Sequence, residues 1–131
     1  MAQIPLVSDQ IESGARFLRL FDARIPVKAA FWVNREESCP WYLYVASEKI
    51  TDANVRDAYG EVFHVVDENV DLSLDPFEIR LISASSPMAR DALRLRGPRP
   101  GVPTHYYGSS LGGEAIEGAY IYPSPMDRVP S

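Results

Sequence analysis

Between residues 27 and 49 the apolar positions alternate with a period of two in two short segments, 27–33 and 41–47. That period is typical of β-strands, and here both faces are largely apolar or aromatic, as in strands covered on both sides. The charged segment between them ends in Pro40, which predicts a short loop. The sequence therefore predicts an antiparallel hairpin near the centre of a sheet. The residues that we expect to be buried in it are Phe31, Trp32, Leu43 and Val45.

Three other stretches repeat their apolar residues at the spacing of an α-helix. The first is residues 9–22, where Asp9 is the expected N-cap. The second runs from a cap at Thr51-Asp52 to about residue 67. The third starts at Ser86-Pro87, a capping residue followed by proline, and runs to about residue 96.

The remaining pattern predicts three more strands. Residues 77–83 alternate apolar and charged side chains, and the segments 104–111 and 114–122 flank Gly112-Gly113, a turn signal that favours positive φ. The element order is α-β-β-α-β-α-β-β. We expect an α+β domain over residues 1–122, with one mixed five-stranded sheet and three packed helices, followed by a Pro-rich tail, 123–131. The second and third strands, and the third and fourth, are each separated by a helix, so either pair is a candidate for parallel pairing.

Composition narrows the classes of function. The net charge is −5, which argues against bulk attraction to nucleic acid or to an anionic membrane. A single cysteine excludes an internal disulfide and favours a reducing compartment, and no apolar run is long enough for a membrane span. The sequence predicts a cytoplasmic protein without a cofactor.

Six short motifs are spread over most of the chain: Pro5 to Val7, Ala29 to Trp32, Trp41 to Ser47, Arg56 to Tyr59, Ser83 to Pro87 and Glu117 to Tyr122. Together they resemble a family of small bacterial α/β proteins of about this length. The chain departs from that family's pattern around residues 96–110 and in its Pro-rich tail. The resemblance implies one compact bacterial domain and carries no activity.

The residues that favour an enzyme lack the spacing that catalysis needs. Cys39 has no histidine near it in sequence, so we expect an incidental thiol, and one cysteine with two histidines shows no metal-ligand spacing. A restriction-nuclease-like core would pair carboxylates with a lysine around Mg²⁺, but the Asp…Glu-x-Lys spacing is absent. This reading stays as the alternative, a small enzyme or nucleic-acid-processing protein. The residues that it would use are Glu12, Lys28, Glu36, Glu37, Glu48 and Lys49.

Two surface features favour an interaction protein instead. The region around residues 80–99 is basic, and its arginines would either complement a helix C-terminus or bind an anionic partner. Tyrosines are abundant in the predicted strands, where they are either core residues or contact residues. The best-supported expectation is a non-enzymatic interaction module whose partner is a second copy or another protein. The candidate contact residues are Tyr42, Tyr44, Tyr120 and Tyr122, and the candidate anionic-partner patch is Arg90, Arg94, Arg96 and Arg99.

Overall fold

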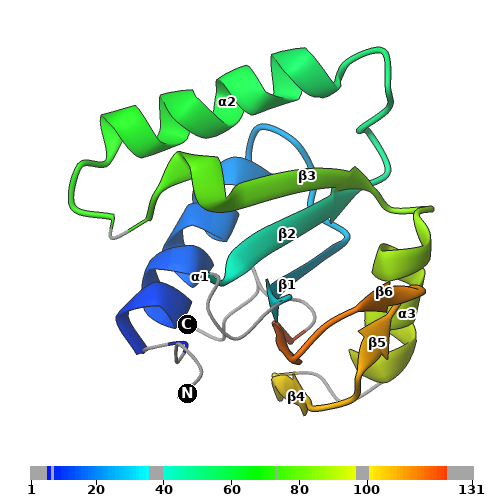
Figure 1. The fold of residues 1–131 in the computed structure, drawn as a ribbon. Coiled ribbons are helices and arrows are strands. Elements are labelled where there is room, and N and C mark those ends of the chain that lie inside the picture. The colour runs from blue at the N-terminus through cyan, green and yellow to red at the C-terminus, as the bar shows by residue number, and fades with distance from the viewer. Residues whose placement is uncertain (1–5, 7, 36–39, 73, 97–100, 124–131) are drawn as a thin grey trace.

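The computed structural model describes residues 6, 8–35, 40–72, 74–96 and 101–123. Three α-helices surround a mixed five-stranded sheet, and a two-stranded sheet lies beside it (Figure 1). The predicted fold class and element order are confirmed. The elements are α1 (Ser8–Asp22), β1 (Ala29–Asn34), β2 (Tyr42–Ser47), α2 (Val55–Glu68), η1 (Pro76–Glu78), β3 (Ile79–Ser83), α3 (Pro87–Arg96), β4 (Thr104–Tyr106), β5 (Ser110–Leu111), β6 (Glu114–Ala115) and β7 (Gly118–Ile121).

The strands of the main sheet follow the order β3-β2-β1-β7-β4. The predicted hairpin β1–β2 is antiparallel and lies inside the sheet, and β2 pairs in parallel with β3. β7 pairs antiparallel with both β1 and β4. The third and fourth strands therefore do not pair, because β2, β1 and β7 separate them and β4 runs opposite to β3.

Alternation along β1 divides the core into two layers. Trp32 points to the side of α1 and α2, where it shares a cluster with Phe17 and Val62. Phe31 points to the side of α3 and packs with Met88. Figure 1 shows the same division, with α3 and the small sheet β5–β6 on one side and α1 and α2 on the other. The predicted burial of the hairpin is confirmed, since Phe31, Trp32, Leu43 and Val45 are each at most 1% exposed.

The C-terminal half departs from the single hairpin that the sequence predicts. The Gly112-Gly113 turn forms, with φ of +60° and +84°, but it joins only β5 and β6. A Cβ on Gly112 would overlap the backbone of Met88, so this turn lies directly on the first turn of α3. Asp91 holds it there by accepting a 2.7 Å hydrogen bond from the Gly112 amide. The predicted hairpin is split because its tip packs on α3 while β4 and β7 join the main sheet.

The first helix begins before its expected cap. Asp9 is the second residue of α1, which starts at Ser8, so Asp9 is not the N-cap that the sequence predicts.

Two further predicted boundaries are wrong for local reasons. The N-cap of α2 is Asn54, not Thr51 or Asp52. The Asn54 side chain accepts a hydrogen bond from the Thr51 amide at 2.8 Å, and the Thr51 hydroxyl accepts one from the Asn54 amide at 3.3 Å, so a tight turn delays the helix. Phe77 belongs to η1 rather than to the third strand. Its ring is 71% exposed and packs edge-on against Phe63 at 5.3 Å.

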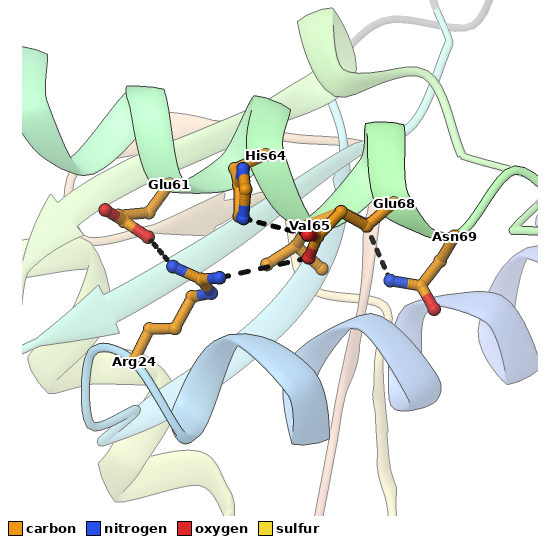
Figure 2. A network of polar contacts seen from close by, with 6 residues as sticks. All are labelled: Arg24, Glu61, His64, Val65, Glu68 and Asn69. Atoms are coloured by element: carbon orange, nitrogen blue, oxygen red, sulfur yellow. Dashed lines mark hydrogen bonds and ion pairs between the residues drawn. The ribbon is translucent and has the colours of Figure 1, made fainter.

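A polar network joins the end of α1 to α2 (Figure 2). Arg24, just beyond α1, pairs with Glu61 and lies 3.9 Å from Glu68. Glu68 in turn lies 3.2 Å from His64 Nε2. Exposed pairs of this kind contribute about 0–1 kcal/mol each, so this network adds little to the stability of the protein. Asn69 ends α2 by donating a 2.8 Å hydrogen bond to the Val65 carbonyl.

Candidate functional site

The four candidate contact tyrosines lie on opposite faces of the sheet. Tyr42 and Tyr44 belong to the α3 side, and Tyr120 and Tyr122 belong to the α1 side. The side chains of Tyr44 and Tyr122 are buried, at 9% and 3% exposure. These four residues therefore do not form one surface, and only Tyr42 and Tyr120 present part of a ring to solvent.

Tyr122 has a structural role that the sequence did not reveal. Its hydroxyl accepts a 2.8 Å hydrogen bond from Trp32 Nε1 and donates one of 2.7 Å to the Ile11 carbonyl, so it ties α1 to the sheet. Burial raises the pKa of this phenol well above its ordinary value. Gly14 lies against the same group, because a Cβ there would overlap the Tyr122 hydroxyl oxygen.

On the other face, Tyr42 and Tyr44 are engaged within the chain. Tyr44 stacks on Phe31 at 5.6 Å, and its hydroxyl accepts a 3.2 Å hydrogen bond from Arg35. The guanidinium of Arg80 lies 4.4 Å from the centre of the Tyr42 ring, a distance typical of a cation–π contact. Both tyrosines therefore have contacts within the chain that explain their positions, and neither position needs an external partner.

A line of rings runs outward from the core on the α1 side, and we name it the aromatic row: Tyr122, Tyr120, His105 and Tyr107. Tyr120 packs edge-on against Tyr122 at 5.3 Å and against His105 at 4.9 Å. His105 stacks on Tyr107 at 6.4 Å, and Tyr107 is 82% exposed. The row thus passes from the buried Tyr122 to the exposed Tyr107, which directly follows β4. Tyr107 is one of the tyrosines that the sequence makes abundant, but neither it nor His105 was a candidate contact residue, because only the pairing of β4 with β7 aligns them with Tyr120.

The two edges of the main sheet differ. At the β3 edge, the Leu81 amide donates a 3.0 Å hydrogen bond to the hydroxyl of Tyr59, which comes from α2. At the other edge, β4 is the terminal strand, with no strand beyond it in the described part of the chain. Residues 101–108 also contain no lysine, arginine, aspartate or glutamate. An uncharged terminal strand is one that another strand can approach.

The predicted arginine patch is only partly assembled. Arg90 and Arg94 line a shallow cleft of about 430 Å³ between α3 and the Gly112-Gly113 turn. Asp91 lies between them, 2.9 Å from Arg94, and the hydrogen bond from Gly112 followed by that from Arg94 lowers the pKa of its carboxyl. Arg96 turns towards the Lys28 carbonyl instead, and burial lowers its pKa. Arg99 lies outside the described residues, so the anionic-partner patch stays a prediction.

The two described acidic residues of the enzyme alternative, Glu12 and Glu48, lie on different elements and share no cleft. Glu12 lies on α1 and Glu48 in the turn after β2. Lys49 lines a cleft of about 450 Å³ with Arg24, Asp57 and Glu61, to which Glu12 and Glu48 do not contribute. Cys39, Glu36 and Glu37 are outside the described residues. Within the described ranges, no three histidine, cysteine, aspartate or glutamate side chains lie close enough to hold a metal ion.

None of the helices that the structure describes combines the length and the apolar character needed to cross a bilayer.

Comparisons with known proteins name no family for this chain. The chain matches no protein-family model, and no curated protein or solved structure is significantly similar to it. The likeness to small bacterial α/β proteins therefore stays a resemblance.

Proposed function

We propose that this protein is a non-enzymatic self-association module that forms a two-fold dimer through the edge of β4. The observation that supports this most directly is the aromatic row, which leads from the buried Tyr122 to the exposed Tyr107 at the terminal strand. Exposed aromatic residues next to unpaired strand edges are typical of contact surfaces.

A second copy of the chain is the partner that this edge fits. Antiparallel pairing of two identical edges about a two-fold axis is self-complementary, and closed dimers are the commonest oligomers. Because residues 101–108 carry no formal charge, two copies bring no like charges together there. The β3 edge is a poorer candidate, since the Tyr59 hydroxyl already accepts a hydrogen bond from the Leu81 amide.

The interface that we propose is small. β4 contains only three residues, so its backbone hydrogen bonds need added support from side chains. Rings that meet across a strand pair add about 0.5–1.5 kcal/mol per pair, and His105 and Tyr107, at and just beyond β4, are the rings placed nearest to this edge. We expect such an interface to bury less than about 1,200 Å² of surface in total, which is the range of weak, reversible complexes.

Sedimentation equilibrium over micromolar to submillimolar concentrations tests the proposal. The wild-type protein should show a reversible monomer–dimer equilibrium, and Tyr107→Glu should shift it to monomer by placing a charge on each side of the axis. The matched control is Phe77→Glu, which changes an aromatic residue of similar exposure, 71%, in η1 beside the β3 edge. A wild-type protein that is monomeric throughout, or a dimer lost in Phe77→Glu and kept in Tyr107→Glu, would contradict the proposal.

A further inference from the structure

The connections after β2 and β3 leave the sheet on opposite faces. β2 is followed by α2, which packs in the cluster of α1 and Trp32, whereas β3 is followed by α3, which packs in the cluster of Phe31. The two strands are adjacent and parallel, and their carboxyl ends meet at the paired residues Ser47 and Ser83. Adjacent parallel strands whose connections diverge in this way leave a crevice at their carboxyl ends, where α/β proteins commonly bind ligands.

A crevice of about 490 Å³ lies at this place, and we name it the switch-point crevice. Its polar wall comes from both loops: Thr51 and Asp52 follow β2, and Ser85 and Ser86 follow β3, whose last residue is Ser83. Its apolar wall includes Val55 and Leu81. Hydroxyls, one carboxylate and an aliphatic surface thus face the same space.

The hydroxyls of the crevice have unused hydrogen-bonding capacity. Each hydroxyl is one donor and two acceptors. The Thr51 hydroxyl accepts from the Asn54 amide at 3.3 Å, and the Ser86 hydroxyl accepts from the Ala89 amide at 3.4 Å. Ser83 and Ser85 share one hydrogen bond of 2.9 Å. Among the residues that the structure describes, the O–H donors of Thr51 and Ser86 and one of the Ser83–Ser85 pair therefore keep no protein acceptor.

We infer that the switch-point crevice binds a small uncharged polyol, such as a sugar. The free O–H donors suit the oxygen atoms of such a ligand, the Asp52 carboxylate accepts from its hydroxyls, and the aliphatic wall suits its C–H surface. A phosphate or carboxylate ligand fits less well, because Asp52 repels an anion and the described lining contains no lysine or arginine. The crevice lies at the β2–β3 side of the sheet, away from β4, so this inference does not depend on dimer formation.

NMR titration of the ¹⁵N-labelled protein tests the inference with four probes: D-ribose, D-glucose, myo-inositol and ribose 5-phosphate. At least one neutral probe should shift the amides of residues 51–54 and 83–86 in a saturable way. Asp52→Asn should weaken that binding about tenfold, because it removes a charged acceptor. Asp57→Asn is the control, since Asp57 lines the neighbouring cleft and not this one. Ser85→Ala should also weaken binding while leaving the Ser86 contact with Ala89 in place.

Three results would overturn the inference. The first is the absence of saturable shifts at both loops with every neutral probe. The second is a response to ribose 5-phosphate alone, which would assign the crevice to anions. The third is an equal loss of binding in Asp52→Asn and Asp57→Asn, which would place the ligand outside the switch-point crevice.

Discussion

The two edges of the main sheet handle their unpaired backbone groups differently. The β3 edge is closed by a side chain, because the crossover from β2 through α2 lays a helix beside β3 and brings Tyr59 to the Leu81 amide. Among the described residues, no strand lies beyond β4, which is three residues long and uncharged and is followed directly by the exposed Tyr107. In one sheet, therefore, the connection through α2 covers part of the edge strand β3, whereas β4 is an edge strand with no further strand beside it in the described residues. We therefore expect stability to be concentrated on the β3 side, and the contact surface that we propose lies on the β4 side.

The largest expected effect tests where stability is concentrated. Leu43 is fully buried and pairs with Ile79 of β3, so Leu43→Ala should destabilise the protein by about 2–5 kcal/mol. Tyr107→Ala at the open edge should change the free energy of unfolding by less than about 0.5 kcal/mol. Urea denaturation at a concentration where the protein is monomeric measures both. Equal losses of unfolding free energy in the two variants would contradict the proposed difference in stability between the two edges.

Two helical glycines, Gly14 on α1 and Gly60 on α2, provide a second test of where stability is concentrated. Gly14→Ala should destabilise by about 1–3 kcal/mol, because the added methyl meets the Tyr122 hydroxyl, which is held by two hydrogen bonds. Gly60→Ala on α2 should stabilise by about 0.5–1 kcal/mol, because nothing lies within 4 Å of the new Cβ and alanine favours a helix. Thermal melts of both variants give the comparison. A stabilised Gly14→Ala would show that α1 is not pinned to Tyr122.

The third test concerns the small hairpin that connects the strands of the open side. The pKa of Asp91 is lowered in the folded protein, so its contribution is present above the ordinary value of 3.8 and is lost as pH falls through the lower folded value. Asp91→Asn should cost about 1 kcal/mol at neutral pH, and this difference from the wild type should vanish in acid below that range. Denaturation curves at a series of pH values measure it. A difference that persists unchanged in acid would show that the carboxylate charge is not responsible.

The smallest expected effect comes from removing the hydroxyl that covers the β3 edge. Tyr59→Phe removes the acceptor of the Leu81 amide at a cost of about 0.5 kcal/mol, because water can replace part of the lost hydrogen bond. The Leu81 amide should exchange its hydrogen faster, whereas the amide of Phe31 inside the sheet should not change. Hydrogen exchange followed by NMR distinguishes the two. An unaltered Leu81 amide would mean that the edge is protected by something other than Tyr59.

The local elements were predictable because each has a periodic or capping signal of its own. The hairpin 27–49, the three helices and the Gly112-Gly113 turn follow from such signals, and the structure contains all of them. The position of β7 between β1 and β4 was not predictable, because it depends on contacts between distant residues. The hydrogen bond from Trp32 to Tyr122 joins residues 90 positions apart, and no local pattern indicates it.

The candidate site was predictable only in residue type. Tyrosine enrichment indicated that aromatic residues matter, but alternation alone did not show that Tyr42 and Tyr120 face opposite sides. His105 and Tyr107 join Tyr120 only because β4 and β7 pair in the observed register. The serines after β3 form a visible motif, Ser83-Ala-Ser-Ser86, but its local signal indicates a turn and a helix start and no ligand. Their place beside Thr51 and Asp52 depends on the parallel pairing of β2 and β3.

The insertion of β7 beside β1 also affects how the protein is made. During synthesis β1 leaves the ribosome with β2 soon after it, but its other neighbour emerges about 90 residues later. Until then, one edge of a largely apolar strand has no partner, and Trp32 lacks the hydroxyl that accepts the hydrogen bond from its indole N–H. Pairing of this kind slows folding because a long loop must close first. While residues 35–117 are being synthesised, the nascent chain therefore carries a central strand that is paired on one edge only, which gives chaperones a surface to recognise.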